Sequence, residues 1–266
     1  IMEYCEVAQR SRAQALSRVA RNLGMAVAGV AGGVLAQTDF RWVFFASAAM
    51  TLLALLWFVR TTWRRPVLVP DERPDTGSGT CVPYRDKPFL WLLATTVLLG
   101  MAFDTVYSTL GNYLRDYYRL NTEAIGWQFA LNAVLVVSLQ IPLTHWGERW
   151  GTRRQLVAGS LLLACGLGML PLGSGLLYAC LSTVVWTLGE ALFMPPLNAR
   201  VMQHAQRGKS GQYFGVFFMS WSASALLSPM LGGQLYGHFG GHSVWLVSAT
   251  LALMSMLAWV VAARTD

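Results

Sequence analysis

Two acidic residues lie inside long apolar segments of this chain, where carboxylates are rare. Asp104 stands in the stretch TTVLLGMAFDTVYSTLGNY, and Glu190 stands in LSTVVWTLGEALFMPPLN. A charged side chain at the centre of a bilayer costs about 2.5–3.5 kcal/mol on insertion scales, so an acid there usually faces a bundle interior or a wet cavity. A carboxyl group removed from water also holds its proton more tightly, which suits proton uptake and release near neutral pH. The two positions therefore predict a proton-binding role. The alternative is a structural acid that is paired with a basic side chain or hydrogen-bonded to a neighbouring helix.

The composition predicts a membrane protein around these acids. Hydrophobic residues make up 55% of the 266 residues and charged residues 12%, which is about half the charged share of soluble proteins. Mean hydropathy is +0.44. The net charge is +7. The basic residues stand between the apolar runs, which is the positive-inside pattern and not that of a nucleic-acid-binding face. We expect an all-α polytopic membrane protein in the lipid bilayer, with no nucleic-acid partner.

Eight apolar segments are long enough to cross a bilayer. Their approximate bounds are 16–37, 42–59, 89–112, 124–146, 155–173, 176–198, 212–236 and 243–263. At about 1.5 Å per residue, Asp104 lies roughly 22 Å from the start of its helix, and Glu190 lies roughly 15 Å from Arg200. Both acids are therefore predicted near the middle of the membrane.

Lysine and arginine residues predict the orientation. If all eight segments cross, seventeen of the twenty lie on the side of the two termini, and the other side holds only Arg41, Arg115 and Arg119. Because these residues concentrate in cytoplasmic loops, both termini are expected in the cytoplasm. The four cysteines show no metal-ligand spacing. The pair His238 and His242 has no acid or cysteine close in sequence, so no metal site is predicted.

The longest connection and an internal repeat predict the domain organisation. Residues 60–88 are rich in proline and charge and include Gly-Ser-Gly, which is typical of a flexible linker. Residues 28–33 and 228–233 end two helices similarly at an offset of 200, and an aromatic-rich helix follows each. A repeat of this length implies two six-helix halves. We expect 1–59 to be a remnant of the first half, 60–88 a cytoplasmic linker and 89–266 the second half, with four helices missing before Ile1.

Several short motifs in this order resemble the major facilitator superfamily, specifically bacterial proton-coupled drug-efflux proteins with twelve helices. Residues 148–154, ERWGTRR, are similar to the signature loop of that family as it recurs between helices 8 and 9. Residues 189–196 resemble a pattern of helix 10, and residues 211–215 resemble the entry to helix 11. Residues 21–33 resemble helix 5 with its antiporter motif, although Ala28-Gly29 stands where the family has Gly-Pro. The chain would then hold helices 5–12.

The resemblance implies roles for three groups of residues. Charges of the 8–9 loop would lock one conformation of the transport cycle, with simple membrane anchoring as the alternative: Glu148, Arg149, Gly151, Arg153 and Arg154. Small residues and a proline would let helices cross closely: Gly24, Gly32, Gly33, Pro229, Gly232 and Gly233. The substrate cavity would be lined by the two acids with polar and aromatic side chains: Asp104, Glu190, Tyr107, Asn132, Trp186 and Trp221.

The function that these features predict is secondary active transport, most simply the export of small lipophilic compounds in exchange for protons. Aromatic side chains suit such compounds, which are often cationic, through stacking and cation–π contacts. Proton-driven uptake of a small metabolite and a truncated membrane protein without transport activity remain as alternatives. No cofactor and no enzymatic activity are expected. The expected location is the inner membrane of a bacterium, with a small-molecule substrate and protons as partners and with the missing N-terminal helices needed to complete the path.

Overall fold

A computed structural model describes residues 38–62, 83–204 and 210–261, together with some of the residues between 19 and 35. Within these residues, every regular element is a helix. Seven helices of the described part are long and apolar enough to cross a membrane. The predicted fold class, an all-α polytopic membrane protein, is therefore confirmed. The first predicted segment, 16–37, lies largely outside the described residues.

The other seven predicted segments each correspond to one helix. These helices are α2 (Phe40–Thr62), α3 (Lys87–Asp116), α4 (Thr122–Glu148), α5 (Thr152–Met169), α6 (Leu176–His204), α7 (Ser210–Phe239) and α8 (Gly241–Val261). Two short 3-10 helices, Pro83–Arg85 and Leu170–Leu172, precede α3 and follow α5. Several helices extend past the apolar segments because helix formation continues into the interface. The largest extension is in α6, which was predicted to end at 198 and runs through Pro195 and Pro196 to His204.

The chain divides into two compact units, residues 1–74 and residues 75–266. The division falls inside the predicted linker, most of which lies outside the described residues. The proposed roles of 1–59, 60–88 and 89–266 stay predictions. In the first unit, none of the α2 side chains that the structure describes is buried. The mean hydropathy of this helix, 2.1, is that of a helix surrounded by lipid or by other apolar helices.

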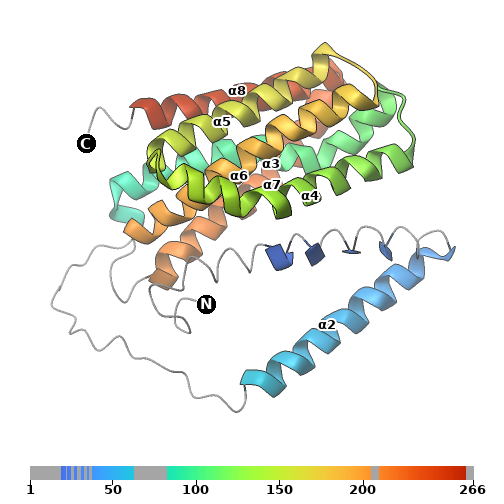
Figure 1. Ribbon diagram of the computed structural model, residues 1–266, viewed down its shortest axis with the longest axis horizontal. Helices are drawn as coiled ribbons and strands as arrows, with labels where there is room; N and C mark the ends of the chain where they lie inside the picture. Colours follow the sequence, from blue (N-terminus) through green and yellow to red (C-terminus); the bar gives the residue numbers. More distant parts are fainter. Residues whose placement is uncertain are drawn as a thin grey trace. The chain divides into compact units, whose positions relative to one another are not determined.

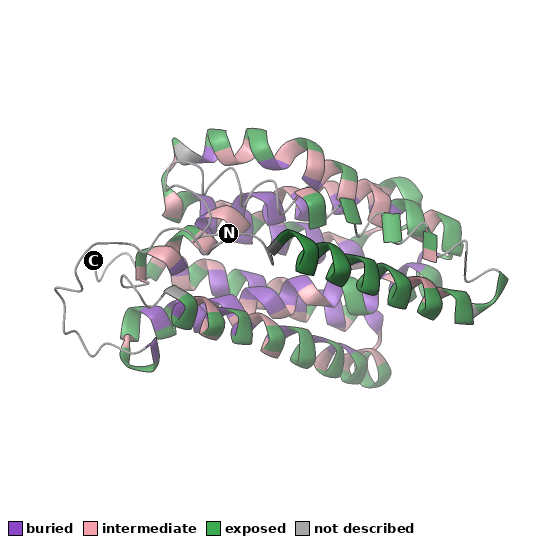
Figure 2. Ribbon diagram, turned by 90° about the horizontal axis from the view of Figure 1, so that it is seen from below, coloured by how far each residue is buried: buried purple, intermediate pink, exposed green. Residues whose placement is uncertain are grey.

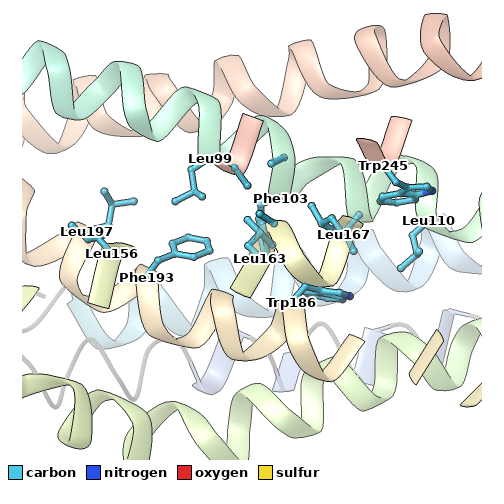
Figure 3. Packing of buried hydrophobic residues seen from close by; sticks show 14 of the residues in the cluster. Leu99, Phe103, Leu110, Leu156, Leu163, Leu167, Trp186, Phe193, Leu197 and Trp245 are labelled. Atoms are coloured by element: carbon cyan, nitrogen blue, oxygen red, sulfur yellow. The ribbon is translucent and has the colours of Figure 1, made fainter. Parts of the chain in front are cut away.

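The second unit is a bundle of α3 to α8, with the helix axes roughly along one direction (Figure 1). Helix α5 packs against α6 and α8, helix α3 packs against α7 and α8, and α4 packs against α6. Buried residues follow the inner faces of these helices, and exposed residues follow the outer faces (Figure 2). Figure 3 shows Leu99, Phe103, Leu163 and Phe193 in the interior, where α3, α5 and α6 meet.

Glycines bring α5 and α6 into very close contact. A Cβ atom at Gly166 would lie 2.6 Å from the backbone nitrogen of Trp186, and one at Gly189 would lie 2.6 Å from the backbone nitrogen of Leu163. Gly159 meets Phe193 and the carbonyl of Gly189 in the same way. Small residues let helix backbones approach within a membrane, where van der Waals packing is a main source of association.

Tyrosines close the end of the bundle where α3 turns into α4. The hydroxyls of Tyr113 and Tyr118 both donate to the carbonyl of Leu170, at 3.2 and 2.7 Å. The hydroxyl of Tyr117 accepts a hydrogen bond from the backbone nitrogen of Gly241 at 2.8 Å. Burial raises the pKa of Tyr118 to about 12, so its hydroxyl stays protonated and keeps donating at all physiological pH values.

Candidate functional site

Asp104 lies on α3, on the half-exposed face of that helix. Its Oδ2 atom is buried, and it has no hydrogen-bond partner among the described residues. One turn earlier, a Cβ atom at Gly100 would lie 2.5 Å from Ser224 Oγ and 3.4 Å from the ring of Trp221. The missing side chain at Gly100 thus lets α7 approach α3 beside the acid. A buried carboxylate oxygen without a partner is costly, so this oxygen is suited to bind a proton or a cationic ligand.

Six aromatic residues are joined by ring contacts around Phe103, the residue before Asp104, and we call them the aromatic cluster: Phe103, Tyr107, Phe129, Phe193, Phe217 and Trp221. Phe103 is at the centre, with ring centroids 5.3 Å from Tyr107 and 6.2 Å from both Phe193 and Trp221. Tyr107 stacks on Phe129 at 6.4 Å, and Phe217 lies 6.5 Å from Trp221. The cluster joins α3, α4, α6 and α7. Tyr107 remains 42% exposed, so part of the cluster is open to a ligand.

Glu190 occupies a different environment, the interface between α6 and α4. Its side chain is only 4% exposed. Asn132 donates through Nδ2 to Glu190 Oε2 at 3.2 Å and to Thr187 Oγ1 at 3.0 Å. A hydrogen bond from a neighbouring helix is what the alternative of a structural acid predicts, and the role of Glu190 in proton coupling stays a prediction. The structure thus brings Asn132 to Glu190, and it brings Tyr107 and Trp221 to the aromatic cluster beside Asp104.

Further polar contacts extend the α4–α6 interface on both sides of Glu190. Gln128 accepts a hydrogen bond from Thr183, and Gln140 donates to the carbonyl of Ala191 at 3.1 Å. Such interhelical hydrogen bonds stabilise the association of membrane helices. Trp186 is part of the neighbouring core: it is 1% exposed and packs on Gly166 of α5. Figure 3 shows its ring in the interior of the bundle. Its role in a substrate cavity stays a prediction, and we leave it out of the site proposed below.

The predicted gating loop connects α4 to α5. Gly151 has a φ of +78°, a conformation that favours glycine, and it precedes the first residue of α5. Arg153 donates through Nε to the carbonyl of Trp259 at 3.3 Å and through Nη2 to the carbonyl of Val260 at 2.8 Å. This arginine therefore joins the first turn of α5, directly after the loop, to the end of α8 by hydrogen bonds. Arg149 is exposed, and the side chain of Glu148 is outside the described part of the structure.

The predicted helix-packing residues have different surroundings. Gly232 is buried, and a Cβ atom there would lie 3.1 Å from Thr109 Oγ1 of α3. Pro229 lies within α7 and is exposed. Gly24, Gly32 and Gly233 have no described neighbour within 4 Å of such an atom. Gly33 lies outside the described residues. The closest approaches of a glycine to the backbone of another helix are those between α5 and α6, which the sequence analysis did not identify as packing contacts.

Asp86 connects the start of α3 to α6 and α7, and the sequence analysis did not identify it. Its Oδ1 atom accepts a hydrogen bond from the backbone nitrogen of Phe89 at 3.1 Å and so caps the first turn of α3. Its Oδ2 atom lies 3.3 Å from Nδ1 of His204 and accepts a hydrogen bond from the hydroxyl of Tyr213 at 3.3 Å. The order Asp-Lys-Pro is typical of a helix start and could have shown the cap. The contacts to α6 and α7 depend on the tertiary fold.

We expect Asp86→Ala to lower the free energy of unfolding by about 1.5–3 kcal/mol, because it removes a cap worth about 1 kcal/mol and two further contacts. Asn121→Ala is the matched control, since Asn121 caps α4 through Ala124 at 2.8 Å and should cost only about 1 kcal/mol. Thermal unfolding of both variants in detergent measures the difference. Equal losses would contradict a connecting role for Asp86.

The described part of the chain holds no group of three or more His, Cys, Asp or Glu side chains that could hold a metal ion. His242 instead packs against aromatic rings, with its ring centroid 4.7 Å from Tyr117 and 5.7 Å from Tyr113.

Comparison with known proteins identifies relatives among membrane transporters. The chain is 25% identical over 90% of its length to the uncharacterized MFS-type transporter YttB of Bacillus subtilis (strain 168). It is 22% identical over 98% of its length to the multidrug resistance protein MdtH of Aeromonas salmonicida (strain A449). It is also 22% identical over 88% of its length to the class H tetracycline resistance protein of Pasteurella multocida.

The chain spans only part of these relatives: 60% of the Bacillus protein, 66% of the Aeromonas protein and 60% of the Pasteurella protein. The relatives are named as transporters or resistance proteins and not as enzymes. The family model of the Major Facilitator Superfamily matches residues 1–123 and 92–266, which together include every residue. With its apolar helices and the motifs described above, this chain belongs to the Major Facilitator Superfamily.

Proposed function

We propose that the protein is a secondary active transporter that exports small lipophilic compounds, preferentially cations, in exchange for protons. The observation that carries the proposal is the buried Oδ2 atom of Asp104, which has no partner among the described residues and follows Phe103, the centre of the aromatic cluster. An acid next to aromatic rings is a suitable site for a lipophilic cation, because the rings supply stacking and cation–π contacts and the acid supplies charge. The relatives named for multidrug and tetracycline resistance support export.

In this proposal, the proton and the substrate compete for Asp104. The ionised carboxylate attracts a cation to the aromatic cluster, and protonation removes the negative charge and so releases the cation. The site opens to the two sides of the membrane in turn, and proton entry is thereby coupled to substrate exit. Glu190 has the structural role in this scheme, since it is hydrogen-bonded to Asn132 between α4 and α6.

The membrane context belongs to the same proposal. We place the protein in the bacterial inner membrane with both termini in the cytoplasm, because basic residues concentrate on that side. Residues 75–266, a compact unit, would form one wall of the transport path. Further helices, of an N-terminal half, would form the second wall. Proton-driven uptake is the second candidate, and the direction of coupling distinguishes it from export.

Flux in proteoliposomes with an acidic interior tests the proposal. The full-length transporter that contains this chain is reconstituted, and a fluorescent aromatic cation is added outside. An antiporter accumulates the cation inside as protons leave, because the two species move in opposite directions. A proton symporter instead drives the cation out. Accumulation that collapses with a proton ionophore supports the proposal, whereas outward flux or no gradient-dependent flux contradicts it.

We expect Trp221→Ala to weaken the apparent affinity for an aromatic cation about two- to thirtyfold, as the loss of a cation–π contact worth about 0.5–2 kcal/mol predicts. Trp127→Ala is the matched control, because Trp127 is on α4, is 65% exposed and is not in the aromatic cluster. The concentration dependence of uptake in the same proteoliposomes measures both affinities. Equal effects of the two substitutions would exclude a substrate contact at Trp221.

A further inference from the structure

A basic groove lies where α4, α5 and α6 end or begin on one side of the bundle. Its volume is about 750 Å³, and its lining includes Arg149, Trp150, Arg153, Arg154, Arg200 and Gln203. Four arginines from two helices and the connecting loop thus surround one space. No acidic side chain is among the described residues that line it. Four like charges in one groove repel one another. An anion between them would be attracted to all four and would offset their mutual repulsion.

Three of the four arginines are available to such an anion. Arg153 is already bound to the carbonyls of Trp259 and Val260. Arg149 and Arg154 are exposed. Arg200 is half-buried, and its Nε atom is buried without a hydrogen-bond partner among the described residues. A buried guanidinium nitrogen that lacks an acceptor is costly, and an anionic oxygen in the groove would satisfy it.

The beginning of α5 adds further donors. The residue before it, Gly151, has no side chain to cap the helix, and no side-chain hydrogen bond closes this end. Gly151 and Thr152 are among the residues that line the groove, so this 18-residue helix begins at the groove with its first backbone N–H groups and the positive end of its dipole. Backbone donors together with arginine forks are the usual means of binding phosphate.

The groove also lies at the level expected of lipid head groups. It is formed at the ends of membrane-spanning helices, and the rings of Trp146 and Trp150 lie against each other there with centroids 4.2 Å apart. Tryptophans concentrate at the membrane–water interface. The predicted orientation would place the groove on the cytoplasmic side of the membrane. On that side, basic pockets between helices bind the head groups of anionic lipids. We propose that this groove binds the phosphate of an anionic phospholipid head group.

Lipid retention by the purified 266-residue chain tests this proposal. The chain is titrated in detergent with phosphatidylglycerol, phosphatidylcholine or inorganic phosphate, and bound molecules are counted by native mass spectrometry. We expect phosphatidylglycerol to bind more tightly than the other two probes. The variant Arg154→Gln/Arg200→Gln should lose about twenty-five-fold in affinity, since each basic residue near a membrane surface contributes about fivefold.

The matched control is Arg115→Gln/Arg119→Gln, which removes the same charge near the end of α3 and the turn after it, away from the groove. It should bind phosphatidylglycerol as the unsubstituted chain does. If the double variant in the groove fails to fold, the exposed Arg154→Gln alone should lose about fivefold. Three results would overturn the proposal: unchanged binding in the groove variants, equal binding of phosphatidylcholine, or inorganic phosphate binding as tightly as the lipid, which would assign the groove to free phosphate.

Discussion

Gradient-driven transport should fall to the level of protein-free liposomes when Asp104 is replaced by asparagine. The amide has the same size as the carboxyl group but cannot take up or release a proton, so the substrate flux loses its coupling. An uncharged side chain is also cheaper to insert into a membrane, so the variant should fold at least as well as the parent. Downhill exchange of substrate should persist in part. The proteoliposome assay with and without a proton gradient measures both activities.

Two further variants make this result specific. Asp116→Asn is the matched control, because Asp116 ends the same helix and its carboxylate pairs with Arg115 at 3.2 Å and accepts a hydrogen bond from Tyr236; it should leave coupling intact. Glu190→Gln should also keep gradient-driven transport, since the amide oxygen can still accept the hydrogen bond from Asn132. Full gradient-driven transport by the Asp104→Asn protein would refute the coupling role. A loss of coupling in Glu190→Gln would transfer that role to Glu190.

The second large effect is expected from Gly166→Ala, which should lower the free energy of unfolding by about 1–3 kcal/mol, the usual cost of overpacking. The added Cβ atom would lie 2.6 Å from the backbone nitrogen of Trp186. A backbone atom cannot rotate away as a side chain can, so α5 and α6 must separate. Because these two helices pack tightly along their length, the separation also weakens contacts at Gly159 and Gly189.

Gly168→Ala is the control for this prediction. The two glycines are two residues apart on the same helix, but a Cβ atom at Gly168 would lie 3.5 Å from Ala249, an ordinary contact distance. Alanine also has the higher helix propensity, so this variant should be neutral or slightly more stable. Thermal unfolding of both proteins in detergent gives the comparison. If Gly166→Ala were as stable as Gly168→Ala, the close packing of α5 on α6 would not hold in solution.

The class of the protein and the place of its helices could be predicted from the sequence. Apolar runs must match the thickness of the bilayer, so α2 to α8 were located within a few residues, apart from the extension of α6. The apolar segment ends at 198, but the helix continues through Pro195 and Pro196 to His204. Proline is tolerated within membrane helices, where neighbouring groups satisfy the freed backbone atoms. The order of motifs was also sufficient to predict the family.

The environment of each candidate site residue was decided only by the tertiary structure. In the sequence, Asp104 and Glu190 are each one acid in an apolar segment, and they differ only in that Glu190 is nearer to the basic end of its helix. The fold separates them, because Asn132 of α4 reaches Glu190 while Oδ2 of Asp104 has no described partner. Phe129 of α4 and Phe193 of α6 likewise belong to the aromatic cluster only because the fold brings their helices to α3. The period of a helix shows which residues share one face, whereas the helix that faces them depends on packing between segments far apart in the chain.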